Sequence, residues 1–308
     1  MKIGIVGAGN VGATIAYTLT LSSYASEVVL VDVNLDKARG EVLDLRHCVP
    51  FAPYTELESG GAELLAGADV VVVAAGIPRK PGESRLDLAK KNNELFKKMI
   101  PGLVKANDEA VYVIVANPVD IMTYAAWKYS GLPKERVFGS GNILDTMRFR
   151  SMLGAHFSVD PACVNAYVLG EHGDSSFPVW AQASIGCVPI KCMDGYDKDE
   201  MARIGENVKT VAADVIRLKG ATYYAIGLGA AKIVEAICLD QSAVFPVSTL
   251  LGGYRGISDV CLSVPAVVNG KGVDRVLKIP LNEAENRSLI GSAEKIGKVL
   301  DELGLRKR

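Results

Sequence analysis

The chain has 308 residues, enough for two domains at ~150 residues each, and 49% of its residues are hydrophobic against 22% charged. These fractions exclude a disordered or fibrous protein. The formal net charge of -1 provides no basic field for nucleic acid or an acidic membrane surface, and no apolar run approaches the ~18 residues of a membrane span. Six scattered cysteines without a Cys-x-x-Cys pair favour reduced thiols in a cytoplasmic protein over a disulfide or metal framework.

The first half of the chain alternates apolar runs with helical patterns. Predicted strands are Lys2–Val6, Glu27–Val33, Ala68–Ala75, Ala110–Ala116 and Val137–Phe138, and predicted helices are Val11–Leu21, Leu35–Leu45, Leu86–Val104 and Pro118–Tyr129. The run DVVVVAA at Asp69–Ala75 is too uniformly apolar for a half-exposed strand and fits a parallel sheet covered on both faces. This alternation predicts an α/β Rossmann domain, a doubly wound parallel sheet, over residues 1–141.

The second half, residues 142–308, has a different pattern and predicts an α+β substrate and catalytic domain. Predicted helices are Leu144–Leu153, Lys198–Leu218, Thr222–Leu239 and an amphipathic C-terminal helix through Leu289 and Leu303. A strand is expected at Val164–Leu169, a further apolar segment at Ile185–Ile190 and short β-type segments between Ala243 and Val276. No flexible linker separates the halves near Gly139–Gly141, so we expect them to pack firmly together.

A glycine-rich turn, Gly7-Ala8-Gly9-Asn10-Val11-Gly12, directly follows the first predicted strand and opens the first predicted helix. Gly7, Gly9 and Gly12 allow a tight turn, close approach of a pyrophosphate and close packing of helix on strand, while the helix N-terminus, with Asn10 and Val11, offers N–H groups to phosphates. Asp32 ends the second strand, where its carboxylate can bind the adenosine ribose and would repel a 2′-phosphate. The pattern therefore predicts a dinucleotide cofactor, NAD rather than NADP.

A proton carrier is needed if the protein interconverts alcohols and carbonyls, and histidine is suited to this because its ordinary pKa lies near neutrality. His47 and His156 each end a predicted helix, where a solvated or capping role is the simpler interpretation. His172 lies in Gly170-Glu171-His172-Gly173-Asp174, a turn after a buried strand, and is the favoured candidate.

Other polar groups stand at strand ends or helix starts. Asn117 follows the fourth strand, and Asp145 and Arg148 can share a helix face, either within a site or as a surface ion pair. The loop 76–85, with Arg79 and Arg85, is a candidate lid over the cofactor or a solvated charged loop. The pair Tyr124 and Lys128 matches the Tyr-x-x-x-Lys of short-chain dehydrogenases, but its amphipathic helix and the different glycine spacing favour a packing role.

Together these motifs resemble the lactate/malate dehydrogenase superfamily in order and over essentially the whole chain. They are the glycine turn with Asp32, the Arg79–Arg85 loop, Asn117-Pro118-Val119-Asp120, Leu144-Asp145-Thr146-Met147-Arg148 and Gly170-Glu171-His172-Gly173-Asp174. Segments such as Gly82-Glu83-Ser84-Arg85-Leu86, Gly139-Ser140-Gly141 and Lys219-Gly220-Ala221-Thr222 are similar to the bacterial L-lactate branch. The resemblance implies an NAD-dependent L-lactate dehydrogenase that assembles as a homotetramer or dimer.

The resemblance also implies a role for each site residue. His172 would exchange a proton with the substrate oxygen, Asp145 would orient its imidazole, and Arg148 would bind the substrate carboxylate. Arg85 would polarise the carbonyl, Asn117 would contact the nicotinamide region and the carbonyl, and Thr222 would line the substrate pocket. The substrate would be a small 2-oxo or 2-hydroxy acid, with no metal, nucleic acid or membrane partner.

The sequence departs from the family pattern at two positions. Arg79 stands where lactate dehydrogenases usually have Gln and malate dehydrogenases have Arg, so we expect appreciable oxaloacetate activity, and a malate dehydrogenase is the alternative. Asn165 replaces a His that often pairs with an Arg, here Arg150, in enzymes activated by fructose 1,6-bisphosphate, so we expect weak activation or none. A non-catalytic NAD-sensing protein is a remote alternative, because it would not need Asp145, Arg148 and His172 together.

Overall fold

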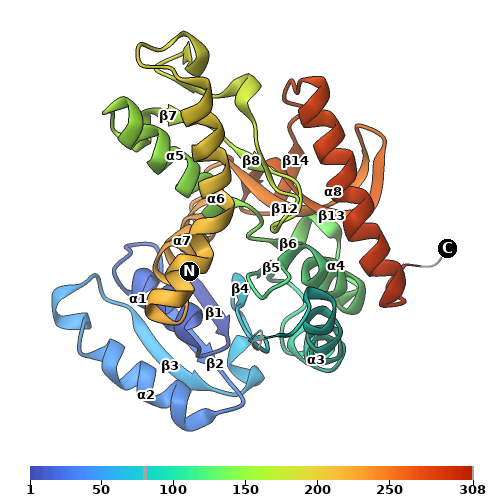
Figure 1. Ribbon diagram of the computed structural model, residues 1–308. Coiled ribbons are helices and arrows are strands. Elements are labelled where there is room, and N and C mark those ends of the chain that lie inside the picture. Colours follow the sequence, from blue (N-terminus) through green and yellow to red (C-terminus); the bar gives the residue numbers. More distant parts are fainter. Residues whose placement is uncertain (79–81, 307–308) are drawn as a thin grey trace.

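A mixed sheet forms the centre of the computed structural model, which describes residues 1–78 and 82–306. In this described part the sheet has nine strands in the order β14-β13-β12-β6-β5-β4-β1-β2-β3 (Figure 1). Its parallel strands are β1 (Lys2–Val6), β2 (Glu27–Val31), β3 (Glu56–Gly60), β4 (Val70–Val73), β5 (Val111–Ile114) and β6 (Val137–Gly139). The prediction of a doubly wound α/β fold is confirmed.

Helices cover both faces of the parallel strands. These helices are α1 (Asn10–Thr20), α2 (Leu35–Arg46), α3 (Arg85–Ala106) and α4 (Val119–Ser130). Val71 and Val73 of β4 pack into the cluster formed with α3 and α4, whereas Val70 and Val72 pack into the cluster formed with α1 and α2. All four valines are fully buried, which is why this strand is uniformly apolar in sequence.

The edge strand β3 was not predicted. Its sequence ELESG is polar, and only Leu57 in it is buried. Because β3 pairs with β2 alone at the edge of the sheet, it needs little apolar surface and gives a weak sequence signal.

The second half of the chain extends this same sheet. In place of the predicted short segments there are two long strands, β12 (Ala243–Tyr254) and β13 (Ile257–Asn269), followed by β14 (Gly272–Val276). β12 joins β6 through the antiparallel pair Ser248 and Gly139. Pro246 lies opposite Pro265, so the two residues that lack an N–H face each other, and Gly252 lies at the register shifts of the β12–β13 pair. The division of the chain at residue 141 stays a prediction, since the main sheet draws strands from both sides of it.

Among the residues described up to 306, four α-helices and two small sheets complete the second half. The helices are α5 (Ile143–Phe157), α6 (Lys198–Lys219), α7 (Tyr224–Cys238) and α8 (Glu283–Glu302). The small sheets contain β7 (Val164–Asn165), β10 (Ser184–Ile185) and β11 (Val188–Pro189) in one, and β8 (Val168–Leu169) and β9 (Phe177–Pro178) in the other. α7 packs on α1 so closely that a Cβ at Gly227 would lie 2.4 Å from Thr14 Cγ2. Within the described ranges, no helix combines the length and apolar character needed to cross a membrane.

Candidate active site

The glycine-rich turn between β1 and α1 has the shape that a pyrophosphate requires. Gly7 has φ +106°, and a Cβ there would lie 2.6 Å from Ala75 N. A Cβ at Gly12 would lie 1.8 Å from the Gly7 carbonyl oxygen, so the helix can begin this close to the strand only with glycine. At Gly9, in contrast, a Cβ would meet nothing within 4 Å, and the backbone there borders open space.

The start of α1 supplies hydrogen-bond donors beside this space. Gly9 precedes the helix and has no side chain with which to cap it, and Ala13 N is the first amide that bonds within the helix. The preceding N–H groups, those of Asn10, Val11 and Gly12, have no hydrogen-bond partner in the described ranges of the chain. Free N–H groups, open space above Gly9 and the positive end of the helix dipole fit the pyrophosphate of a dinucleotide.

We expect Gly9→Ala to weaken binding of reduced NAD at least tenfold and to leave the melting temperature unchanged. The added methyl group enters only the open space, where it would keep the phosphates from the amides, and a hydrogen bond to a charged group is worth ~1.5–3 kcal/mol. Fluorescence titration with reduced NAD and thermal unfolding measure the two effects. Gly40→Ala is the matched control, because a Cβ there also meets nothing within 4 Å. Unchanged affinity in Gly9→Ala would contradict the assignment of this turn to the cofactor.

Asp32 lies at the end of β2, directly beside the glycine-rich turn. Its Oδ2 accepts a hydrogen bond from Ala8 N at 2.6 Å, and its Oδ1 accepts one from Asn34 N at 2.8 Å. These two backbone bonds hold the carboxylate in place at the edge of the cofactor space. A fixed negative charge at this position suits ribose hydroxyl groups and repels an added phosphate.

His172 is joined to the Asp145 carboxylate, the partner that the family resemblance implies, by a short hydrogen bond. Its Nδ1 lies 2.7 Å from Asp145 Oδ2, and 23% of its side chain is exposed. In the part of the chain that the structure describes, Nε2 has no hydrogen-bond partner. Burial disfavours the imidazolium ion, but the Asp145 carboxylate outweighs this effect and raises the pKa of His172 above its ordinary value.

Arg148 binds the other oxygen of the same carboxylate. Its Nη1 donates to Asp145 Oδ1 at 2.8 Å, from one turn further along α5. Burial disfavours the Asp145 carboxylate, but His172 and Arg148 together hold its pKa below the usual range. Both side chains are largely buried, so this ion pair belongs to the site and is not a surface pair. The unused guanidinium nitrogens can still bind a substrate carboxylate.

Two residues that sequence reasoning did not assign also hold His172. Asp120 Oδ2 accepts from the His172 backbone N at 2.6 Å, and its Oδ1 accepts from Ser248 Oγ at 2.6 Å. Asn142 Oδ1 lies 3.2 Å from His172 Nδ1, while its Nδ2 donates to the Gly170 carbonyl oxygen at 3.2 Å. A carboxylate within the otherwise apolar first turn of α4 was the available signal for Asp120.

Asp120 carries a shifted pKa. The side chain is 2% exposed, and burial raises the pKa of its carboxyl group to about 6 in spite of the bonds from Ser248 and His172. The carboxylate is thus stabilised by the same backbone amide that it positions. This contact connects the β12 and β13 region of the sheet to the turn that carries His172.

Arg85, the first residue of α3, reaches the same turn. Its Nη2 donates to Asp174 Oδ1 at 2.7 Å, and its Nη1 lies 3.6 Å from Glu171 Oε1. A Cβ at Gly173 would lie 2.0 Å from Arg85 Nη1, so the guanidinium lies against the backbone next to His172. Its partner in the predicted loop, Arg79, lies outside the described residues.

Asn117 and Thr222 show no hydrogen bond to the His172 cluster in the ranges that the structure describes. Asn117 has an exposed side chain after β5, and its backbone carbonyl accepts from Asn92 Nδ2 at 2.8 Å. The buried Asn92 also bonds to Ile77 N at 2.7 Å and so ties the start of the loop to Asn117. Thr222 is half-buried in the short connection between α6 and α7. Their roles toward substrate and cofactor remain predictions.

The other candidate residues from the sequence, His47, His156 and the pair Tyr124 and Lys128, lie apart from the His172 cluster or have structural partners. His47 is exposed, and His156 Nε2 lies 3.1 Å from the Gly195 carbonyl oxygen. Tyr124 donates to Asp259 Oδ1 at 2.7 Å, and Lys128 donates to the Leu305 carbonyl oxygen, so this pair ties α4 to β13 and to the end of the chain. No cluster of metal-binding side chains is present among residues 1–78 and 82–306.

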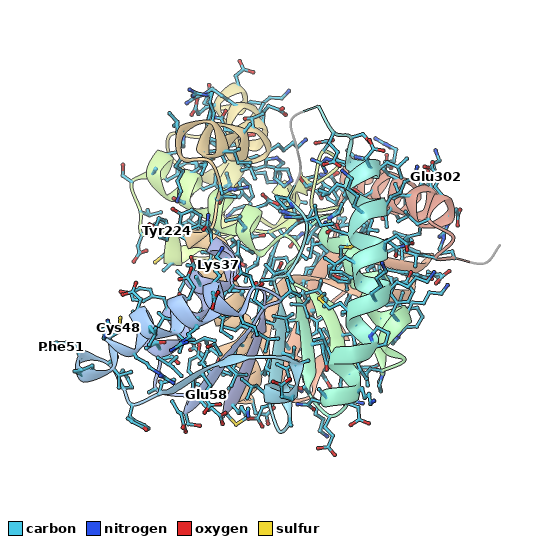
Figure 2. All side chains as sticks on the ribbon, turned by 90° about the horizontal axis from the view of Figure 1, so that it is seen from below. Lys37, Cys48, Phe51, Glu58, Tyr224 and Glu302 are labelled. Carbon is cyan, nitrogen blue, oxygen red and sulfur yellow. The ribbon has the colours of Figure 1, made fainter. Side chains whose placement is uncertain are left out.

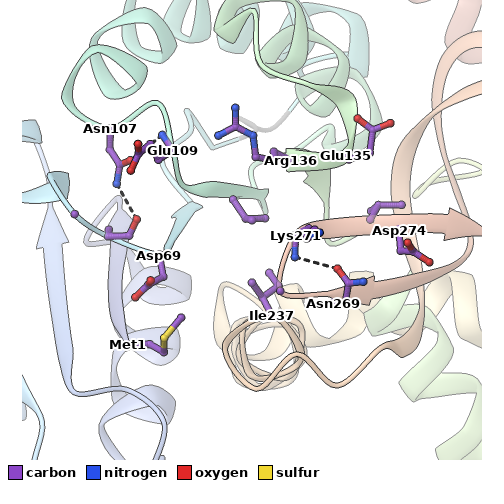
Figure 3. A pocket seen from close by; sticks show the side chains of 15 residues that line it. Met1, Asp69, Asn107, Glu109, Glu135, Arg136, Ile237, Asn269, Lys271 and Asp274 are labelled. Carbon is purple, nitrogen blue, oxygen red and sulfur yellow. Dashed lines mark hydrogen bonds between the residues drawn. The ribbon is translucent and has the colours of Figure 1, made fainter.

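A pocket of about 670 Å³ lies at the amino-terminal ends of the parallel strands, on the side of the sheet opposite to the glycine-rich turn (Figure 3). Met1, Asp69 and Val111 in its lining stand at the starts of β1, β4 and β5, whereas the glycine turn and Asp32 follow strand ends. Because parallel α/β sheets bind ligands beyond the carboxyl ends of their strands, we do not assign this pocket to the reaction.

Two family models match the chain. The model described as lactate/malate dehydrogenase, NAD binding domain, covers residues 1–139, and the one described as lactate/malate dehydrogenase, alpha/beta C-terminal domain, covers residues 143–304. The chain belongs to the lactate/malate dehydrogenase family. It is therefore an NAD-dependent oxidoreductase, and the cofactor inferred from the glycine turn and Asp32 is confirmed.

Individual members of the lactate/malate dehydrogenase family match over full length. The L-lactate dehydrogenase of Thermoanaerobacter sp. (strain X514) is 45% identical over 99% of both chains, and that of Acetivibrio thermocellus is 44% identical over 99% of this chain and 98% of the relative. Among solved structures, a lactate dehydrogenase from a Medee basin deep-sea metagenome library and the minor L-lactate dehydrogenase of Enterococcus mundtii each superpose with a TM-score of 0.95. Each of the two is 37% identical over 98% of both chains.

Proposed function

We propose that the protein is an L-lactate dehydrogenase, which interconverts pyruvate and L-lactate with NAD. The observation that carries the proposal is the Asp145 carboxylate, shared between His172 on one oxygen and Arg148 on the other. This arrangement places a proton carrier next to a cation that can bind a carboxylate. A 2-oxo acid, with a carbonyl one bond from a carboxylate, has the complementary pair of groups.

The proton transfer follows from the hydrogen bond at Nδ1. Asp145 accepts from Nδ1–H, so the ring presents Nε2 to the substrate, and the raised pKa of His172 favours the form with protons on both nitrogens. The chemistry supplied by the bound cofactor is hydride transfer at the carbon that bears the oxygen. In reduction Nε2–H donates its proton to that oxygen, and in oxidation the neutral Nε2 accepts it.

The remaining proposed residues bind and orient the substrate. Arg148 would bind the carboxylate through its free guanidinium nitrogens, and Arg85 would donate to the carbonyl oxygen as negative charge develops there. Asn117, at the end of β5, would contact the nicotinamide region and the carbonyl, and Thr222 would line the pocket. The contact of Arg85 with Asp174, two residues after His172, supports its place beside the reacting groups.

Substrate choice is the central test of the proposal. We propose that pyruvate is reduced and that oxaloacetate is accepted appreciably, because the guanidinium of Arg79 could bind a second carboxylate. We expect Arg79→Gln to lower kcat/KM for oxaloacetate at least tenfold, on the order of one lost charged hydrogen bond, and to spare pyruvate. The measurement is kcat/KM for both acids with reduced NAD in the wild type and the variant.

Two outcomes would contradict parts of this proposal. Wild-type kcat/KM far higher for oxaloacetate than for pyruvate would make the protein a malate dehydrogenase. Oxaloacetate turnover that survives Arg79→Gln unchanged would show that Arg79 does not contact the substrate. Lys278→Gln, which removes a positive charge in the segment after β14, is the matched control for the loss of charge.

Self-association as a homotetramer, with a dimer as the alternative, is also part of the proposal. Large apolar side chains are exposed on α1, directly after it and on α7, which packs against α1, namely Tyr17, Leu21, Tyr224 and Leu228. Tyr224 is labelled in Figure 2, as is the fully exposed Phe51, which ends the short 3-10 turn Val49–Phe51 after α2. Exposed apolar side chains concentrated on neighbouring elements are typical of protein interfaces.

The composition and the scattered cysteines support a cytoplasmic location.

A further inference from the structure

The C-terminal helix α8 contacts the turn that carries His172. Ser292 Oγ donates to the Ser175 carbonyl oxygen at 2.7 Å, and Lys295 Nζ donates to Glu171 Oε2 at 2.7 Å. Ser292 and Lys295 are three residues apart, so both lie on the helix face that meets the turn. Lys295 thus contacts Glu171, the residue directly before His172, from 124 positions further along the chain.

Lys295 and Arg85 contact the same two carboxylates, those of Glu171 and Asp174. Arg85 lies 2.7 Å from Asp174 and 3.6 Å from Glu171. Lys295 lies 2.7 Å from Glu171 and 3.9 Å from Asp174. The four side chains form a closed group of two positive and two negative charges around the turn, here called the charge square.

The two carboxylates of the charge square differ in how much compensation they need. The Asp174 side chain is 74% exposed, so water solvates its charge, but the Glu171 side chain is only 9% exposed. A buried carboxylate without a bound cation is costly. Burial disfavours the ionised form of Glu171, but the bonds from Lys295 and Ser175, with Arg85 nearby, hold its pKa below the usual range. Glu171 is therefore a negative charge at neutral pH.

We propose that Lys295 is a positioning residue, which neutralises the Glu171 carboxylate and thereby leaves the Arg85 guanidinium available to the substrate carbonyl oxygen. The inference rests on the role proposed above for Arg85. A guanidinium that faces an uncompensated, buried carboxylate binds it in preference to a carbonyl oxygen, which carries only developing charge. The 2.7 Å bond from Lys295 occupies Oε2 of Glu171, whereas Arg85 Nη1 lies 3.6 Å from Oε1 of the same carboxylate.

The first test replaces Lys295 by methionine, which keeps the apolar stem and removes the charge. We expect kcat for pyruvate reduction to fall about tenfold, the lower end of what one charged hydrogen bond contributes. We expect KM for pyruvate to change less than about twofold, because Arg148 and not Arg85 is proposed to bind the substrate carboxylate. Lys295→Arg restores the charge and should restore kcat. Lys298→Met is the matched control, since Lys298 is exposed on the same helix one turn further on.

The second test separates this role from simple bracing of the turn. Glu171→Gln keeps a carbonyl oxygen for Ser175 but removes the negative charge, so the double variant Glu171→Gln with Lys295→Met should recover most of the lost kcat. If Lys295 only braced the turn, the double variant would be at least as slow as the single one, and both would melt at lower temperature. Such a result, or a Lys295→Met enzyme with unchanged kcat, would overturn the inference. A wild-type protein that reduces no 2-oxo acid would instead overturn the proposed function, and with it the role of Arg85.

Discussion

His172→Asn is expected to lower kcat by ~10²–10⁴-fold, the usual contribution of a positioned acid–base group. The reason is that His172 Nε2 has no hydrogen-bond partner among the described residues, while both oxygens of Asp145 are bound by His172 and Arg148. Binding of reduced NAD should remain nearly intact, because the phosphates are assigned to the separate turn Gly7–Gly12. Steady-state kinetics with pyruvate and fluorescence titration with reduced NAD measure the two effects.

The control for this variant is His156→Asn. His156 lies at the end of α5 and bonds to the Gly195 carbonyl oxygen, so its replacement should leave kcat within about twofold of wild type, as expected for a surface change outside the site. Turnover by His172→Asn at a near-wild-type rate would remove His172 from the mechanism. Loss of reduced NAD binding in the same variant would show that the cofactor and the proton carrier are not held separately.

Asp145→Asn is expected to change both the rate and its dependence on pH. Removing the charge that stabilises the imidazolium ion should lower kcat/KM for pyruvate by ~10²–10⁴-fold at neutral pH, the contribution of the proton transfer itself. Part of the loss should appear as a higher KM, because Arg148 loses the partner that orients it. The asparagine amide keeps the size of the side chain, so the protein should still fold.

The direction of the pH shift follows from the forces on His172. Reduction needs the protonated ring, so activity is present below the pKa of His172 and is lost as the pH rises through it. In the wild type Asp145 outweighs burial and raises this pKa; in Asp145→Asn burial and Arg148 both lower it. The fall in kcat/KM should therefore occur at lower pH in the variant, in a series from about pH 5 to about pH 9. An unchanged pH midpoint would contradict the assignment of Asp145, and Asp214→Asn on the exposed face of α6 is the control.

Asp120 illustrates a part of the site that local sequence patterns could not assign. It lies in the recognisable segment Asn117-Pro118-Val119-Asp120, yet nothing in that segment indicates that its carboxylate binds the His172 amide. Its other partner, Ser248, is 128 positions away in the chain. Burial raises the pKa of Asp120 to about 6, and that burial depends on tertiary packing, including the packing of α4 against β12 and β13.

Features that depend on local periodicity and local backbone geometry could be predicted from the sequence. Uniformly apolar runs such as Asp69–Ala75 indicate strands buried on both faces. Gly7 and Gly12 lie where a Cβ atom would clash with the backbone, so only glycine fits there. A histidine in a glycine-flanked turn, with an Asp and an Arg one helical turn apart, was enough to name His172, Asp145 and Arg148 as candidates. These signals arise from neighbours a few residues apart, so they can be read without knowledge of the fold.

The groups that surround those candidates could not be predicted, because they come from distant parts of the chain. The polar edge strand β3 and the extension of the main sheet by β12, β13 and β14 had weak or misleading local patterns, since an edge strand needs little apolar surface and long strands can contain paired prolines. The contacts of Asp120, Asn142 and Lys295 with the His172 turn join segments 30 to 124 residues apart. Burial and charge pairing depend on these distant neighbours. The direction of the pKa shifts of His172 and Glu171, and the charge square around the His172 turn, therefore follow only from the folded chain.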